Sequence, residues 1–234
     1  MTWTRRREPE WMDDPTLDAA LHRQALDGLQ RINSWSRSGA AIWQAISNLA
    51  VHRQLREIRI LDLAMGGGDV AMRLAHCAVR DNLHVTITGC DISPVAVAEA
   101  QLRALAAGAR NVDFRPLDVL REDLPGGYDV VMCSLFLHHL DESDAVLFLK
   151  KMRDAARQLV LVDDLRRTWL GYWLAWLGCR MLSRSLVVHK DGPLSVAAAF
   201  TSTEVCELAQ RAGLLGATIT HHWPQRFLLR WSRP

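Results

Sequence analysis

Apolar and polar positions along this chain of 234 residues follow a helical period at its start. The first apolar residues recur at spacings of three or four, which is the pattern of one helix face: Leu17, Leu21, Ala25, Leu29 and Ile32. Asp14 and Pro15 predict the start of this helix, because an acid suits the cap and proline suits the first helical position. A second helix is predicted around Ile42, Ile46 and Leu49.

Beyond the second helix, short apolar runs alternate with helical stripes. The predicted strands lie near 58–63, 84–90, 112–117, 128–135 and 158–163. The predicted helices between them lie near 70–79, 94–107 and 141–156. Strands that alternate with helices in this way predict a parallel sheet covered by helices on both faces.

The end of the chain has a different pattern. Thr201 and Glu204 form a capping box, which predicts a helix that Gly213 closes. Two strands follow near 216–223 and 226–232, and the connection between them is too short for a parallel crossover. The predicted fold class is therefore α/β, with a doubly wound, mostly parallel sheet of seven strands that ends in an antiparallel hairpin.

Composition adds few constraints to this picture. Hydrophobic residues make up 49% of the chain, and the net charge of +2 gives no general attraction to nucleic acid. The run from Arg5 to Arg7 is interpreted as a solvated terminus. Five cysteines without a CxxC pair predict buried free thiols, and no signal peptide or apolar run of about 18 residues is visible. We therefore expect a cytoplasmic protein without a membrane span.

The segment DLAMGGGD, which begins at Asp62, joins the first predicted strand to the next helix. Its glycines allow a ligand to approach the backbone closely, as at the nucleotide-binding corner of a doubly wound sheet. Asp62 ends a strand expected to be buried, so its carboxylate needs a partner, which a cationic ligand would supply. Gly66, Gly68 and Ala71 also fit a dinucleotide pattern, with Asp91 twenty residues further on, so an NAD enzyme is an alternative.

Read as acid-x-Ala-x-Gly-x-Gly, this segment resembles the first motif of the class I S-adenosylmethionine-dependent methyltransferases. The resemblance covers about residues 55–232, including the terminal hairpin. It implies that the cofactor is bound by Asp62, Ala64, Gly66, Gly68 and Asp69. Ala64 stands where the family has its first glycine, and this narrows the space for the methionine end of the cofactor. Asp69 has the alternative role of complementing the positive start of its helix.

Two further segments carry the resemblance. The segment GCDISP resembles the second family motif, in which Asp91 would bind the ribose hydroxyls and Ile92 would lie against the adenine. Asp118 and Val119 follow the third strand, where the family has an acid that accepts from the adenine amino group. The alternatives are that Asp91 serves only as a turn or helix cap and Asp118 only as a turn residue.

The stretch from residue 128 to 140 resembles the fourth-strand motif of the family. The resemblance implies that Ser134 and Leu135 face the methionine part of the cofactor and the acceptor. His138 and His139 follow, and either could remove a proton from an acceptor hydroxyl. A structural or acceptor-contacting role is the alternative. The other histidines lack metal-ligand spacing with cysteine or aspartate, so no metal is predicted.

An insert at about 165–200 places Trp169, Trp173 and Trp176 on one face of a predicted helix, between flanking arginines. This helix could pack on the core or in a dimer interface, form a wall of an apolar acceptor pocket, or lie on a membrane surface. In the family this region helps to form the acceptor site. Asp163 and Asp164, just before the insert, are interpreted as structural partners of the arginines that follow, with the orientation of an acceptor nitrogen as the alternative.

The resemblance implies N-terminal lid helices at 1–50 and a methyltransferase domain at 51–234. The implied reaction converts S-adenosylmethionine to S-adenosylhomocysteine and methylates a small apolar or aromatic metabolite on a hydroxyl oxygen. Carbon methylation of a quinone or polyketide-like ring is one alternative, and a non-catalytic cofactor-binding or scaffold protein is another. No nucleic-acid partner is expected, because the chain lacks the Asn/Asp-Pro-Pro-aromatic motif of base methyltransferases. A homodimer remains open.

Overall fold

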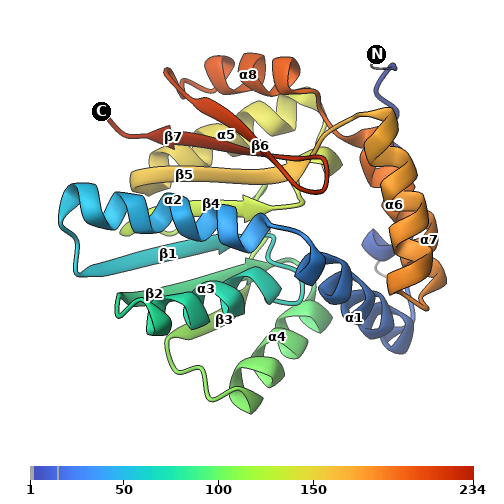
Figure 1. Cartoon of the computed structure of the whole chain (residues 1–234), viewed down its shortest axis with the longest axis horizontal. Helices are drawn as coiled ribbons and strands as arrows, with labels where there is room; N and C mark the ends of the chain where they lie inside the picture. Colours follow the sequence, from blue (N-terminus) through green and yellow to red (C-terminus); the bar gives the residue numbers. More distant parts are fainter. Residues whose placement is uncertain (1–2, 15) are drawn as a thin grey trace.

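The computed structural model describes residues 3–14 and 16–234. Its centre is one seven-stranded sheet with the order β3-β2-β1-β4-β5-β7-β6 (Figure 1). The strands are β1 (Glu57–Leu63), β2 (His84–Asp91), β3 (Val112–Pro116), β4 (Tyr128–Ser134), β5 (Ala156–Leu165), β6 (Thr218–His222) and β7 (Arg226–Ser232). The first five strands pair in parallel, whereas β7 runs antiparallel to both β5 and β6. The predicted fold class is confirmed.

Helices cover both faces of the sheet and one end of it (Figure 1). The α-helices are α1 (Ala19–Trp35), α2 (Ser38–Arg53), α3 (Asp69–Arg80), α4 (Pro94–Ala106), α5 (Glu142–Ala155), α6 (Trp169–Leu182), α7 (Leu186–Ala198) and α8 (Ser202–Arg211). Two short 3-10 helices are η1 (Trp11–Asp13) and η2 (Leu137–His139). Helices α2, α3 and α4 pack on one face and α5 and α8 on the other, while α1, α6 and α7 lie beyond the carboxyl ends of the parallel strands.

The apolar pattern of β1 explains the two cores. Side chains alternate across a strand, so Ile58 and Ile60 enter the core beneath α2 and α3, and Leu61 and Leu63 enter the core beneath α5 and α8. All four are buried. A strand that is apolar on both faces fits only the centre of a covered parallel sheet, which is where β1 lies.

The start of α1 differs from the prediction. Asp18 caps the helix by accepting hydrogen bonds from the backbone N–H groups of Ala20 and Leu21. Asp14 instead accepts from Thr16, and Pro15 lies outside the described residues. The prediction placed the cap four residues too early because Asp14 and Asp18 are both good capping residues, and the local sequence does not rank them.

The insert forms two helices, α6 and α7, rather than one. The second of these helices contains Gly192 and Pro193. Glycine and proline usually end a helix. Here Gly192 permits close packing of the two helices, since a Cβ at this position would collide with the sulfur of Cys179 in α6. Tertiary packing therefore overrides the local signal.

The capping box of α8 is present as predicted: the Thr201 hydroxyl accepts from the Glu204 N–H, and the Glu204 carboxylate accepts from the Thr201 N–H. The described cysteines are free, and Cys206 is exposed rather than buried. None of the helices formed by the described residues combines the length and the apolar character that a bilayer crossing needs.

Candidate functional site

A cavity of about 1040 Å³ lies at the carboxyl ends of the parallel strands. It lies at the end of β1, which pairs with β2 on one side and with β4 on the other. The order of the strands therefore reverses at β1: β2 and β3 extend the sheet to one side, and β4 and β5 extend it to the other. Such a switch point leaves a crevice between the loops that follow the two strands, which is where doubly wound sheets bind ligands. The cavity is lined by all but one of the thirteen sequence-predicted site residues: Asp62, Ala64, Gly66, Asp69, Asp91, Ile92, Asp118, Val119, Ser134, Leu135, His138 and His139.

Gly66 and Gly68, in the loop between β1 and α3, have different surroundings. Gly66 and Gly68 both adopt positive φ, of 54° and 76°. A Cβ at Gly66 would meet no atom within 4 Å, so this backbone is open to a ligand. Gly68, the thirteenth predicted residue, is not among those that line the cavity. A Cβ there would lie 3.0 Å from that of Ala100 and 3.1 Å from the ring of Phe114, so close packing requires this glycine.

Ala64 also adopts a positive φ, of 51°, in the left-handed region that favours glycine. The sequence identified this position as the one departure from the family motif. The structure adds that the departure places a Cβ in a strained backbone conformation at the cavity wall.

Asp62 is the most unusual group of the site. Its side chain is buried, with the residue only 1% exposed, and neither carboxyl oxygen has a hydrogen-bond partner among the described residues. Burial, together with the nearby charge of Asp91, raises its pKa from 3.8 to about 8. A buried carboxyl group without a partner is costly. The orphaned oxygens at the cavity wall therefore fit a cationic ligand, as the sequence predicted for a nucleoside that carries a sulfonium and an ammonium group.

Asp91 combines a structural role with the predicted ligand position. One carboxylate oxygen accepts from the Gly66 N–H at 2.8 Å, and the other accepts from the Ser93 N–H at 2.9 Å. Ser93, rather than Asp91, caps α4. These two bonds fix the carboxylate against the glycine loop. A carboxylate offers two acceptor oxygens, which suits the vicinal hydroxyls of a ribose.

Asp118 and Asp69 are more firmly engaged in the protein. One oxygen of Asp118 accepts from the N–H groups of Leu120 and Arg121, as in the turn that the sequence offered as an alternative. Asp69 contacts Arg103 at 3.1 Å, and Arg103 also contacts Asp27 of α1 at 2.7 Å. Burial raises the pKa of Asp69, while Arg103 opposes this shift. Asp69 therefore links the start of α3 to α4 and α1 while also lining the cavity.

His138 and Asp164 form a buried pair on the opposite side of the cavity. The Asp164 carboxylate accepts from the backbone N–H of His138 at 3.1 Å and lies 2.7 Å from its Nδ1 atom. Burial raises the pKa of Asp164, but the charge and hydrogen bonds of His138 outweigh this effect and hold that pKa below its ordinary value. An ionised carboxylate only accepts hydrogen bonds, so Nδ1 carries the proton and leaves Nε2 directed away from Asp164.

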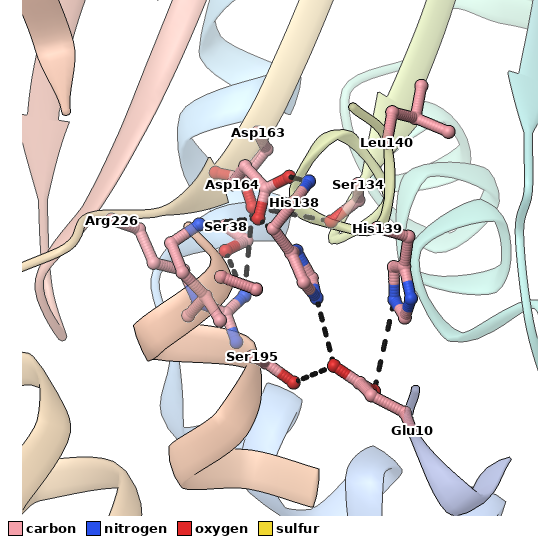
Figure 2. A network of polar contacts seen from close by, with 12 residues as sticks. Glu10, Ser38, Ser134, His138, His139, Leu140, Asp163, Asp164, Ser195 and Arg226 are labelled. Carbon is pink, nitrogen blue, oxygen red and sulfur yellow. Dashed lines mark hydrogen bonds and ion pairs between the residues drawn. The ribbon is translucent and has the colours of Figure 1, made fainter. Parts of the chain in front are cut away.

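Glu10 faces this pair from the N-terminal segment (Figure 2). One of its oxygens lies 3.7 Å from Nε2 of His138 and accepts from the Ser195 hydroxyl at 2.6 Å, and the other lies 4.0 Å from Nε2 of His139. Sequence reasoning missed Glu10, because an acid in a charged, aperiodic segment carries no local signal. These side chains of Glu10, His138 and His139 offer ligand atoms within 4.8 Å of one another, so the absence of a metal stays a prediction.

The N-terminal segment is held firmly in place, contrary to the expectation of a solvated terminus. Arg5 donates to the carbonyl oxygens of His138, Leu140 and Ala198, and Arg7 donates to that of His139. These bonds join residues far apart in sequence, so the basic run could not be assigned from its own composition. They position the segment that brings Glu10 to the cavity.

The expected pairing of Asp163 and Asp164 with the arginines that follow is wrong. Asp163 lies 2.6 Å from Nε2 of His222 and 3.6 Å from Arg226, both on the C-terminal hairpin. Arg167 pairs instead with Glu204 at 2.6 Å. The two acids point to opposite faces of β5, because successive side chains of a strand alternate. One acid therefore stabilises the hairpin and the other holds His138.

The remaining walls of the cavity are mainly apolar. They come from α1 and α6, which pack against each other beyond the strand ends (Figure 1). The lining side chains include Leu26, Leu29, Ile32, Leu174, Leu177 and Leu182. The three tryptophans of α6 do not line the cavity; they are exposed on the outer face of the helix.

Comparison with known proteins places this arrangement among methyltransferases. A family model described as a methyltransferase domain matches residues 60–158. Ubiquinone biosynthesis O-methyltransferase of Bordetella parapertussis is 27% identical over 158 residues, which cover 67% of this chain and 61% of that protein. The protein of the same description from Paracidovorax citrulli is 33% identical over 91 residues, 38% of this chain and 36% of its own length. The chain therefore spans about one third to two thirds of these relatives.

Solved structures agree on the fold. Magnesium protoporphyrin IX methyltransferase from Synechocystis, crystallised with bound S-adenosylhomocysteine, superposes with a TM-score of 0.59 at 17% identity, covering 94% of this chain and 90% of that chain. An O-methyltransferase family 2 protein from Planctomyces limnophilus, in complex with apigenin, gives a TM-score of 0.57 at 15% identity, covering 76% and 51%.

Proposed function

Because this chain belongs to the class I S-adenosylmethionine-dependent methyltransferases, we propose that it methylates a hydroxyl oxygen of a small, apolar or aromatic metabolite. The observation that carries the proposal is the His138–Asp164 pair, because its His138 lines the same cavity as Asp62 and Asp91. The dinucleotide alternative has no support in these comparisons. The free cysteines favour the cytoplasm, where thiols stay reduced.

The donor side of the cavity fits S-adenosylmethionine, whose sulfonium supplies an activated methyl group. We assign the ionised form of Asp62 to its cationic part, because none of the described residues hydrogen-bonds to this carboxylate. Asp91 would bind the ribose hydroxyls, Ile92 and Val119 would contact the adenine, and Asp118 would accept from the adenine amino group. The open backbone at Gly66 leaves room for the nucleoside.

On the acceptor side, the task of the protein is to orient a hydroxyl and remove its proton. Asp164 holds the proton on Nδ1 of His138, so that Nε2 has a lone pair to accept a proton from the acceptor. The same carboxylate stabilises the imidazolium that results, as in other carboxylate–histidine pairs. We assign His139 and Glu10 to contacts with the acceptor rather than to proton removal.

Two observations support the acceptor class. Leucine and isoleucine side chains of α1 and α6 dominate the wall beside His138, and this surface favours apolar over charged compounds. The curated relatives above are described as O-methyltransferases, which favours oxygen over carbon.

The proposal is tested with purified protein, S-adenosylmethionine and a panel of phenols and hydroxyquinones of increasing alkyl length. We expect an O-methyl product, identified by mass spectrometry and NMR, and no loss of turnover on addition of EDTA. His138→Ala should lower kcat by about 10²–10⁴-fold, the usual contribution of a general base, and His139→Ala should lower it much less. If both variants keep the wild-type turnover and pH profile, the assignment of the base is wrong.

A separate measurement tests the cofactor assignment. Isothermal titration calorimetry should show S-adenosylhomocysteine binding to the wild type, and Asp91→Ala should weaken it strongly. Unchanged affinity would contradict the ribose assignment. Tight cofactor binding without methyl transfer to any panel member, or to compounds in a native extract, would favour the non-catalytic alternative.

A further inference from the structure

The outer face of α6 carries a group of exposed apolar side chains that the proposed reaction does not use. Trp173 is 58% exposed and Met181 is 73% exposed. The other exposed apolar side chains in the same region are Trp169, Leu170, Trp176, Leu177 and Leu186. We call these seven residues the α6 face. Single exposed apolar residues are common on protein surfaces, but a continuous row of this size marks a binding surface.

Helix α6 is apolar on both sides, and the structure separates their roles. Leu174, Ala175, Gly178 and Leu182 line the cavity. Cys179 is buried, and it packs in the small core with α1 and α7. The three tryptophans lie on the other side: Trp169 contacts the ring of Trp3 at a centroid distance of 4.5 Å, and Trp173 is 58% exposed.

The charged side chains of the segment that carries the α6 face have one sign. No aspartate or glutamate occurs between residues 165 and 190, which contain five cationic side chains. Arg180 and Arg184 are exposed, and the Arg180 guanidinium lies 4.2 Å from the centre of the Trp176 ring. Arg167 does not contribute, because it is buried and paired with Glu204. An apolar row bordered by unopposed arginines complements a negatively charged partner.

We propose that the α6 face binds the headgroup region of an anionic lipid bilayer, with the helix lying in the plane of the membrane. Tryptophan is favoured at this boundary, and arginines beside an apolar face add attraction to anionic lipids. A second copy of this chain fits less well, since a two-fold interface over this face would bring Arg180 and Arg184 close to the same residues of the partner.

The position of the cavity suggests a function for this membrane contact. Leu177 and Met181 belong to the α6 face and also line the cavity, so one apolar surface runs from the exposed side of the helix to the cavity. An apolar acceptor dissolved in the bilayer would reach the cavity across this edge. The membrane contact itself does not depend on the proposed methyl transfer.

Vesicle co-sedimentation tests the proposal without cofactor or acceptor, so its outcome is independent of enzyme activity. The vesicles contain phosphatidylglycerol and phosphatidylcholine in equal amounts, and pure phosphatidylcholine vesicles serve as the comparison. We expect the wild type to bind the anionic vesicles at least tenfold more strongly. Trp173→Asp should weaken this binding by about 10–100-fold, and the double variant Arg180→Glu/Arg184→Glu by about tenfold.

Leu105→Asp is the matched control, because Leu105 is 80% exposed on α4, away from the α6 face. It should bind like the wild type, and circular dichroism should show all variants folded. The proposal is overturned if the wild type does not bind anionic vesicles or if Trp173→Asp binds as well as Leu105→Asp. A dimer in sedimentation velocity that Trp173→Asp dissociates, without vesicle binding, would assign the face to a second copy.

Discussion

The two sides of the cavity are built in different ways. The proposed donor side consists of strand ends and the loops that follow them, so that Asp62, Gly66 and Asp91 are placed by short segments with recognisable spacing. The acceptor side is assembled from distant parts of the chain, with Glu10 facing His138 and Asp164. A sequence motif can therefore reveal the cofactor, while the acceptor site depends on contacts that no local pattern records.

A substitution on the proposed acceptor side alone should have the largest effect on turnover. Asp164→Asn should lower kcat by about 10²–10⁴-fold, because an amide no longer fixes the proton on Nδ1 of His138. The affinity for S-adenosylhomocysteine, measured by calorimetry, should stay within about threefold of the wild type, because Asp164 belongs to the proposed acceptor side of the cavity.

Asp163→Asn is the control for this variant. Asp163 is as deeply buried and lies next in sequence, but it contacts His222 rather than His138. Its turnover should stay within about tenfold of the wild type. An equal loss of kcat in both variants would indicate that β5 is damaged and would remove the argument for a His138–Asp164 base.

Asp62→Asn probes the donor side through stability. With a pKa of about 8 in the folded, ligand-free protein and about 3.8 when unfolded, Asp62 binds more protons in the folded state between these values. Its ionisation therefore lowers the free energy of unfolding as pH rises through this window. The neutral variant should be more stable than the wild type by roughly 6 kcal/mol at pH 9 and by about half of that at pH 6.

Thermal and urea unfolding at both pH values, without cofactor, check this expectation, with the exposed Asp113→Asn as a control. The variant should also bind S-adenosylmethionine more weakly. A larger loss for S-adenosylmethionine than for S-adenosylhomocysteine would identify the sulfonium as the partner of Asp62. A variant that is no more stable at pH 9 than at pH 6 would show that Asp62 has another partner.

Glu10→Gln tests whether the N-terminal segment belongs to the acceptor side. The amide can still accept from Ser195, but it removes the negative charge facing His138 and His139. We expect kcat/KM for the acceptor to fall by about tenfold, equivalent to about 1.4 kcal/mol, with unchanged binding of S-adenosylhomocysteine. Glu8→Gln, which loses only an exposed pair with Arg6, should behave as wild type. Equal activity of the two variants would leave Glu10 without a role in the reaction.

The smallest expected effect concerns the strained residue of the glycine loop. Ala64→Gly removes a Cβ from a positive-φ position and should raise the free energy of unfolding by about 1 kcal/mol or less, since glycine also costs more backbone entropy. Ala98→Gly, at an exposed position inside α4, should lower it by about 1 kcal/mol. Urea unfolding measures both free energies. If both substitutions change the free energy of unfolding in the same direction, the backbone at Ala64 is not strained.

Local sequence predicted most of the elements. The predicted strand positions, the parallel pairing and the C-terminal hairpin agree with the structure. The reason is that apolar runs alternate with helical stripes along the chain, and this alternation locates each element to within a few residues. The errors occurred where two local signals competed or where packing overrode one. Asp18 rather than Asp14 caps α1, and Gly192 lies inside α7 because that helix packs against Cys179.

The residues of the proposed donor side could be identified from the sequence, because parallel strands bring their carboxyl ends to one edge and thereby gather the residues that follow each strand. The partners of the buried acids could not be read from the sequence: Asp164 holds His138, Asp163 holds the hairpin, and Asp62 has no hydrogen-bond partner among the described residues. The tertiary structure also decided that the tryptophans of α6 face outward. The physical reason is that these contacts join residues far apart in the chain, whose approach depends on how the packed layers fit together rather than on any local preference.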